Sequence, residues 1–190
     1  HTTARRQRQM CIRDSYKTYQ EMAEKESTRA DGIDVVSIVT PNHLHVPIAK
    51  IFAENGIHII CDKPIGMSSK EAIDLKKVIE SKKLIFALTH NYTGYPMVRH
   101  ARSLVQKGDL GSLRVIQAEY PQDWLTKKAE DSGLKQAEWR TDPNRSGAGG
   151  CIGDIGTHAY NLIRFITGLE VDEISADIHT FVEGLSLIHI

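Results

Sequence analysis

The sequence has no surplus of charge: 24 lysine and arginine residues balance 24 aspartate and glutamate residues. Nucleic acids and anionic membranes attract proteins through a concentrated excess of lysine and arginine, so neither is an expected partner. Long apolar runs are missing too. A membrane-spanning helix needs about 20 apolar residues, whereas the longest runs, such as 57–61 and 84–88, are far shorter. No stretch has the order of a signal peptide, and a cytoplasmic protein is expected.

Cysteine is scarce, with three widely separated residues, Cys11, Cys61 and Cys151. An odd number of scattered cysteines fits neither a disulfide framework nor a four-cysteine zinc site, so reduced thiols are expected. His43 and His45 could be considered as zinc ligands together with Cys61. At a helix start, however, the two histidines would diverge by about 200°, and no metal site is predicted.

Glycine is missing from the first 31 residues, and Gly32 is the first in the chain. A dinucleotide-binding domain normally begins with a strand, a glycine-rich turn and a helix whose N-terminus receives the pyrophosphate. No residue before Gly32 can form that turn. The glycine cluster at 147–150 follows a polar stretch instead of a strand, which favours simple chain flexibility before a helix. The chain is therefore expected to be an internal piece of a longer protein.

Strands and helices alternate in the first half of the chain. Short β-branched runs are typical of buried strands, and the segments between them have apolar residues at helical spacing. Ser68, with Glu71 three positions later, forms a capping box that starts one helix. The alternation predicts βαβ units and a parallel sheet with right-handed crossovers. The predicted helices are 16–27, 43–54 and 68–81, and the predicted strands are 33–39, 57–61 and 84–88.

The three predicted strand ends carry polar and proline-containing motifs at 40–43, 62–64 and 89–92. In an open parallel sheet, ligands bind beyond the carboxyl ends of the strands. These motifs are therefore expected to face one crevice. The pattern then changes, and the elements predicted for the second half are a helix over 96–107, a strand over 113–120, a polar loop over 124–146 and a strand over 174–182.

The most informative stretch is the segment 153–158, which opens an apolar helical run ending near Ile166. Four positions separate Asp154 from His158, so in an α-helix both side chains project from one face, one turn apart. Apolar residues beside the pair give the helix a reason to be buried. The pair is interpreted as an acid/base pair on a rigid helix.

Three motifs carry a family resemblance when they are taken together: Thr40-Pro41-Asn42-His43-Leu44-His45, Cys61-Asp62-Lys63-Pro64 and the helix with Asp154 and His158. They resemble the Gfo/Idh/MocA family of nicotinamide-dependent sugar and polyol oxidoreductases. The resemblance implies an α/β protein with a partial Rossmann-type parallel sheet, followed by the start of an α+β domain with a mostly antiparallel sheet. The implied organisation is the C-terminal part of a dinucleotide-binding domain over 16–92, followed by a partial substrate and oligomerisation domain over 93–184. Residues 1–15 are expected to be either non-native or a disordered tail. Residues 185–190 are expected to be either non-native or a continuation of the last strand.

The resemblance also implies reversible oxidation of a secondary alcohol of a sugar or polyol, with hydride transfer to NAD or NADP. Lys63, Asp154 and His158 match the family's catalytic positions. Histidine, with an ordinary pKa of about 6.5, suits a base for the alcohol proton. Asp154 would orient that imidazole, and Lys63 would stabilise the developing alkoxide. The cofactor contacts implied by resemblance are Thr40, Pro41, Asn42, His43, His45, Asp62, Lys63, Pro64, Asn91, Trp139 and Arg140.

Two positions depart from the family pattern. Asp62 stands where glutamate is more common, so its contact with the cofactor ribose or Lys63 is open, and Asn161 replaces a common aspartate beyond His158. The full-length protein is expected to be a homo-oligomer, and this chain alone is expected to be inactive. Two alternatives stay open: a redox-neutral glycoside hydrolase that keeps its nicotinamide bound, and a non-catalytic nucleotide-sensing or scaffold protein.

Overall fold

The computed structural model describes residues 15–123, 126, 133, 135–177 and 179. The expectations for the two ends of the chain, 1–14 and 185–190, lie outside these residues. The same is true of the last part of the strand predicted over 174–182.

Three parallel strands form one sheet in the order β1 (Val35–Ile38), β2 (His58–Asp62) and β3 (Phe86–Thr89). The register places Asp62 at the end of β2 opposite Thr89 at the end of β3. Each observed strand lies within two residues of its predicted bounds. The predicted parallel sheet is therefore confirmed, and its strand ends lie side by side.

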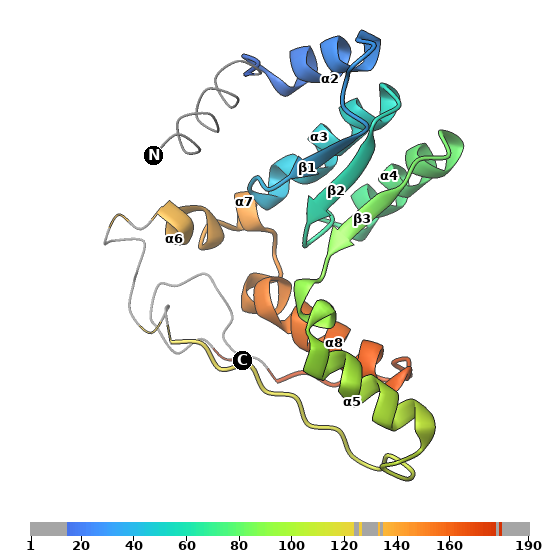
Figure 1. Cartoon of the computed structure of the whole chain (residues 1–190). Coiled ribbons are helices and arrows are strands. Elements are labelled where there is room, and N and C mark those ends of the chain that lie inside the picture. Colours follow the sequence, from blue (N-terminus) through green and yellow to red (C-terminus); the bar gives the residue numbers. More distant parts are fainter. Residues whose placement is uncertain (1–14, 124–125, 127–132, 134, 178, 180–190) are drawn as a thin grey trace, which may run out of the picture.

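Helices α3 (His45–Glu54) and α4 (Ser69–Ser81) pack on this sheet, and α2 (Tyr19–Thr28) packs against α3 (Figure 1). The predicted cap of α4 is confirmed, because the Ser68 hydroxyl accepts a hydrogen bond from the backbone N–H of Glu71 at 3.3 Å. No helix among the described residues is long and apolar enough to cross a membrane.

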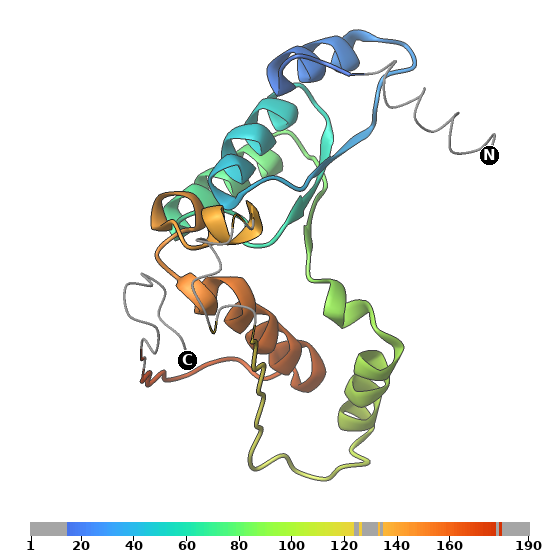
Figure 2. The same ribbon diagram turned by 90° about the vertical axis from the view of Figure 1, so that its left-hand side faces the viewer.

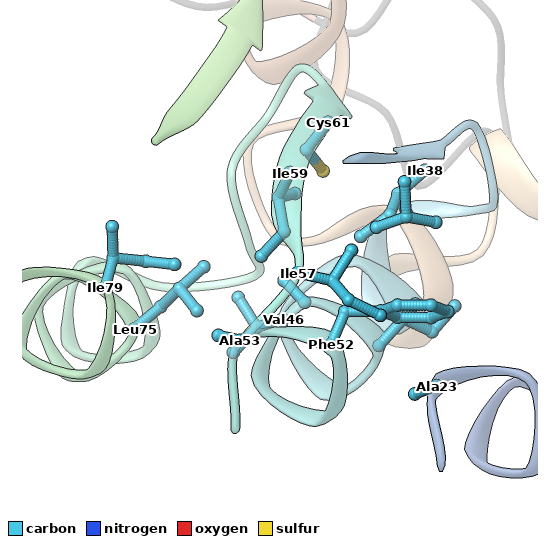
Figure 3. Close-up of a cluster of buried hydrophobic side chains, with 13 residues drawn as sticks. Ala23, Ile38, Val46, Phe52, Ala53, Ile57, Ile59, Cys61, Leu75 and Ile79 are labelled. Atoms are coloured by element: carbon cyan, nitrogen blue, oxygen red, sulfur yellow. The ribbon is translucent and has the colours of Figure 1, made fainter. Parts of the chain in front are cut away.

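The hydrophobic core lies between the sheet and these helices (Figure 3). Phe52 from α3, Ile59 from β2 and Leu75 from α4 are almost completely buried, and burying such a side chain contributes roughly 1.5–3 kcal/mol. Side chains alternate along the strands, so Val35 and Ile60 point to the opposite face and are more than a third exposed. Among the described residues, the sheet is packed on one face.

The second half begins where β3 continues through the short helix η2 (Asn91–Gly94) into α5 (Pro96–Lys107). Figure 2 shows α5 beside α8 (Thr157–Thr167), away from the sheet. The bounds of α5 match the prediction, because Pro96 suits the first helical position and Gly108 takes the left-handed conformation at φ 77°.

The prediction of a strand over 113–120 is wrong, because these residues are irregular in the structure. Val115, in the middle of this segment, is 85% exposed. Residues 174–177, the described start of the other predicted strand, are also irregular and exposed. A strand exists only where a neighbouring strand takes up its backbone hydrogen bonds. No described residue provides that neighbour for 113–120, although the apolar alternation is present.

The segment predicted as a polar loop over 124–146 contains two short helices, α6 (Lys135–Arg140) and α7 (Pro143–Ser146), so the loop prediction is wrong there. Asp142 caps α7 by accepting a hydrogen bond from the backbone N–H of Asn144 at 2.9 Å. The helices lie beside the carboxyl end of β1 (Figure 1). The residues that suggested a loop therefore start a helix next to the predicted crevice.

Candidate active site

Lys63 directly follows β2, where Pro64 lacks the N–H needed to continue the ladder. Its side chain is 14% exposed and reaches the carboxylate of Asp154, with 2.9 Å between Nζ and Oδ1. Nζ also donates to the backbone carbonyl of Asp154. The structure thus joins two predicted catalytic residues that lie 91 positions apart in the sequence.

The carboxylate of Asp154 faces a second cation. Nε of Arg140, at the end of α6, lies 3.6 Å from Oδ2 of Asp154. The Arg140 guanidinium also lies over the ring of Trp139, 4.4 Å from its centre. Asp154 therefore balances two positive charges, and of the predicted Trp139-Arg140 pair Arg140 lies next to Asp154 while Trp139 contacts Arg140.

Asp154 lies in a single π-helical turn, η4 (Ile152–Gly156), instead of the predicted α-helix. The backbone N–H of Thr157 bonds to the carbonyl of Ile152, five residues back. The α-helix proper begins at Thr157, and no side-chain hydrogen bond joins Asp154 to His158 in the described structure. The prediction that Asp154 lies in a regular α-helix is therefore wrong.

His158 is 7% exposed, and two aromatic side chains contact its ring. The ring centre lies 4.5 Å from that of Tyr92 and 5.8 Å from that of His90. Burial lowers the pKa of His158, the Lys63 ammonium and then the neighbouring His90 imidazole lower it further, and Asp154 opposes them more weakly. His158 is therefore neutral at pH 7 and able to accept a proton.

The residues after β1 leave two buried polar atoms without a hydrogen-bond partner in the described structure, Oγ1 of Thr40 and Nδ1 of His43. Pro41 lies between Thr40 and the short helix η1 (Asn42–Leu44). A buried polar atom without a partner costs roughly 1–3 kcal/mol. Two such atoms at a strand end are groups that a bound ligand could satisfy.

Asn42 and His45, both expected to contact the cofactor, are engaged with the protein itself. The Asn42 side-chain amide donates to the carbonyl of Ser146 at 2.8 Å. The ring nitrogens of His45 lie 2.7 Å from the Pro64 carbonyl and 2.8 Å from the Thr40 carbonyl, and the residue is almost completely buried. Both residues therefore hold the strand-end loops together.

Asp62 and Asn91 also lie at strand ends. Oδ1 of Asp62 accepts a hydrogen bond from the Thr89 hydroxyl at 2.7 Å, so the shorter acid links β2 to β3. Asn91 starts η2 and is exposed. Of the predicted cofactor contacts, Thr40 and His43 therefore each keep a buried polar atom without a partner in the described structure, and Asn91 is exposed.

The contribution of His90, Tyr92 and Tyr120 to the site was not predicted from the sequence. The hydroxyls of Tyr92 and Tyr120 are 2.8 Å apart and their rings stack at 5.9 Å. This hydrogen bond, followed by burial, raises the pKa of Tyr92 to about 12. His90 and Tyr92 directly follow β3, and that strand-end position was the available signal.

Metal and thiol chemistry have little support in this part of the chain. Within the described residues, no group of three or more histidine, cysteine, aspartate or glutamate side chains could hold a metal ion. Cys61 is a free, buried cysteine, and burial raises the pKa of its thiol to about 12. A thiol with this pKa is protonated at neutral pH and is a poor nucleophile.

Two family profiles match the chain. The profile described as "Oxidoreductase family, NAD-binding Rossmann fold" matches residues 1–90, and the profile described as "GFO/IDH/MocA C-terminal domain" matches residues 98–187. The interval between them contains η2 and the start of α5. Together they span nearly the whole chain.

Individual proteins are similar over most of this chain. An uncharacterized oxidoreductase of Bacillus subtilis, YfiI, is 33% identical over 88% of this chain and 43% of its own length. Levoglucosan dehydrogenase of Pseudarthrobacter phenanthrenivorans is 33% identical over 79% of this chain and 37% of its own length. The crystal structure of an oxidoreductase from Sinorhizobium meliloti is 46% identical, with a TM-score of 0.75, over 91% of this chain and 43% of that protein. The chain thus spans about two fifths of the length of these relatives.

Proposed function

This chain belongs to the Gfo/Idh/MocA family of oxidoreductases, and on that premise we propose that the protein transfers a hydride between NAD or NADP and a secondary alcohol carbon of a sugar or polyol. The observation that carries the proposal is the convergence of Lys63, Asp154 and His158 at the carboxyl ends of the strands. The similarity to levoglucosan dehydrogenase supports a sugar as the substrate class. We propose residues 16–92 as part of the dinucleotide-binding domain and 93–184 as part of the substrate domain.

His158 is the proposed base. Oxidation of an alcohol releases the hydroxyl proton, and a neutral, buried imidazole accepts it at pH 7. In the reverse reaction the same ring returns the proton to the carbonyl oxygen. When bound, the nicotinamide accepts the hydride from the carbon that carries the hydroxyl.

Lys63 is the proposed electrostatic group. Asp154 holds its ammonium at the strand end through the 2.9 Å contact, and the second cation, Arg140, shares that carboxylate. A fixed positive charge beside the reacting oxygen stabilises the alkoxide as it forms. The same charge disfavours protonation of His158 before the substrate arrives.

The residues after β1 fit the nicotinamide end of the cofactor. The unpartnered Thr40 hydroxyl and His43 Nδ1 offer hydrogen bonds there, and Lys63 lies at the end of the next strand. No glycine occurs before Gly32, so residues 1–31 offer no glycine-rich turn for the pyrophosphate. We therefore expect the 190-residue chain to be inactive and to bind NADH weakly, and micromolar affinity in a fluorescence titration would contradict this.

The test of function is a cofactor-reduction assay on the full-length protein with anhydrosugars, aldoses and cyclic polyols, using NAD⁺ and NADP⁺ in parallel. We expect Lys63→Ala and His158→Ala to remove turnover while cofactor affinity stays within a few-fold. Lys76→Ala and His100→Ala, at exposed positions of α4 and α5, are the matched controls. Retained turnover in both site variants would refute the proposal. Product formation without net NADH release would indicate the redox-neutral hydrolase instead.

We also propose that the full-length protein forms a homo-oligomer through its second half. Val115 and Ile174, in the two segments with strand-like alternation, are each more than 80% exposed in this chain. Light scattering of the full-length protein tests this, and a monomer at micromolar concentration would contradict it.

A further inference from the structure

The position of the His158 ring is not explained by the carboxylate in the preceding turn. Asp154 directs one oxygen to Lys63 and the other toward Arg140. No hydrogen bond links its carboxylate to the His158 ring in the described part of the chain. His158 is nevertheless buried, and a buried catalytic ring must be held in one orientation to react efficiently. Other side chains must provide that support.

The support comes from the residues that follow β3. Tyr92 contacts the His158 ring at 4.5 Å between centres with a 46° tilt, and His90 meets it edge-on at 5.8 Å and 86°. These are the separations of packed aromatic pairs. Tyr92 is itself held by its hydrogen bond to Tyr120. The backbone carbonyl of His90 accepts bonds from both N–H and hydroxyl of Thr93. Both contacts therefore come from an anchored segment.

The sheet explains why His90 lies near Lys63. Asp62 and Thr89 are the last paired residues of β2 and β3, and their side chains bond to one another. Lys63 and His90 are the residues that directly follow these two neighbouring strands, so both begin at the same edge of the sheet. The ammonium of Lys63 is close enough to lower the pKa of His90, after burial as the first cause. His90 is therefore a neutral imidazole at pH 7.

The charged and titratable groups that act on His158 come from three elements. Lys63 follows β2, His90 and Tyr92 follow β3, and Asp154 lies in the turn before α8. Burial is the largest cause of the lowered pKa of His158, and Lys63 and then His90 lower it further. Asp154 raises this pKa, and its effect is the smallest of the four. Two imidazoles beside one ammonium resist double protonation, so their titrations depend on one another.

We propose that His90, together with Tyr92, is the positioning residue for His158, because their rings pack against its imidazole and hold it in one orientation. The resemblance to the family assigns the orienting role to Asp154, and the structure gives that residue to Lys63 and Arg140 instead. The use of His158 as a base rests on the proposed function, whereas its contacts with His90 and Tyr92 do not.

The test is a pH titration of the His158 ring by NMR in the folded 190-residue chain. His90→Phe keeps an aromatic ring but removes the titrating group, so the pKa of His158 should rise. Asp154→Asn should shift it less and in the opposite direction, because that carboxylate favours the protonated form. His100→Phe, on the exposed face of α5, is the matched control and should leave the titration unchanged.

His90→Gln provides a second variant if the phenylalanine disturbs the fold, and the same upward shift is expected. Tyr92→Leu should move the His158 ring-proton resonance downfield, because the ring current of a tyrosine at 4.5 Å is lost. An unchanged titration in both His90 variants would overturn the proposal. A larger shift in Asp154→Asn than in either of them would overturn it too. The titration requires no turnover. Its outcome therefore does not depend on whether the dehydrogenase assay detects activity.

Discussion

Replacing Lys63 with methionine tests how much the contact between the two halves stabilises the fold. Methionine keeps most of the length of the side chain but removes the charge and both hydrogen bonds to Asp154. Hydrogen bonds to charged groups contribute roughly 1.5–3 kcal/mol, whereas exposed ion pairs contribute about 0–1 kcal/mol. The pair lies between these cases, since Lys63 is 14% and Asp154 33% exposed.

The remaining cation moderates the expected loss. Arg140 stays 3.6 Å from the carboxylate after the substitution, so Asp154 is not left as an isolated charge. With solvent screening at Asp154 included, the free energy of unfolding should fall by about 1–2 kcal/mol. For an m-value of about 2 kcal/mol/M, the urea midpoint should fall by about 0.5–1 M.

Urea unfolding followed by circular dichroism measures this loss. Lys76→Met is the matched control, because the Lys76–Glu80 pair on α4 is exposed and 3.6 Å apart, and no measurable change is expected. In an Asp154→Asn background, Lys63→Met should cost clearly less than in the wild type. Equal midpoints for Lys63→Met and Lys76→Met would refute the reasoning.

Two further predictions concern pH and packing. The pKa of His158 is lower in the folded chain than the ordinary value of about 6.5, so the unfolded chain binds this proton more readily. The stability that comes from keeping His158 neutral should be complete above that ordinary pKa, and it should be lost as the pH falls through the folded pKa. Urea midpoints for His158→Gln should therefore decline less than those of the wild type as the pH falls. An identical decline would contradict this. An added Cβ at Gly32 would lie 1.9 Å from the Glu26 carbonyl oxygen, whereas no atom lies within 4 Å of one at Gly94. Gly32→Ala should therefore cost about 1–3 kcal/mol or more and Gly94→Ala little, and equal melting temperatures would contradict this.

Local signals predicted the helices and the sheet well. Pro96 and Gly108 fix the two ends of α5 through the backbone conformations they prefer, and Ser68 fixes the start of α4 through its hydrogen bond to Glu71. These interactions lie within a few residues of one another. Sequence therefore predicts them without knowledge of tertiary contacts.

Elements that depend on distant partners were harder to predict. The alternating residues of 113–120 have the pattern of a strand, but pairing requires a neighbour that the pattern does not contain. The π-turn at Ile152–Gly156 also departs from the regular helix that spacing assumes, in a glycine-rich stretch where the backbone is least restricted. Spacing therefore placed Asp154 and His158 near one another and did not predict how each is engaged.

The π-turn at Ile152–Gly156 is accompanied by separate contacts for Asp154 and His158. A continuous α-helix would have favoured direct pairing of Asp154 with His158, and a carboxylate bonded to the imidazole would raise its pKa. In the observed arrangement the carboxylate meets Lys63 and Arg140, and His158 contacts aromatic and imidazole rings. The cations are thereby fixed by charge, while the base stays neutral through burial and through the charge of Lys63. A site that must accept a proton and stabilise an alkoxide needs both a neutral base and a fixed positive charge. If Asp154 were shared between Lys63 and His158, it would hold the Lys63 ammonium less firmly and would also favour protonation of His158.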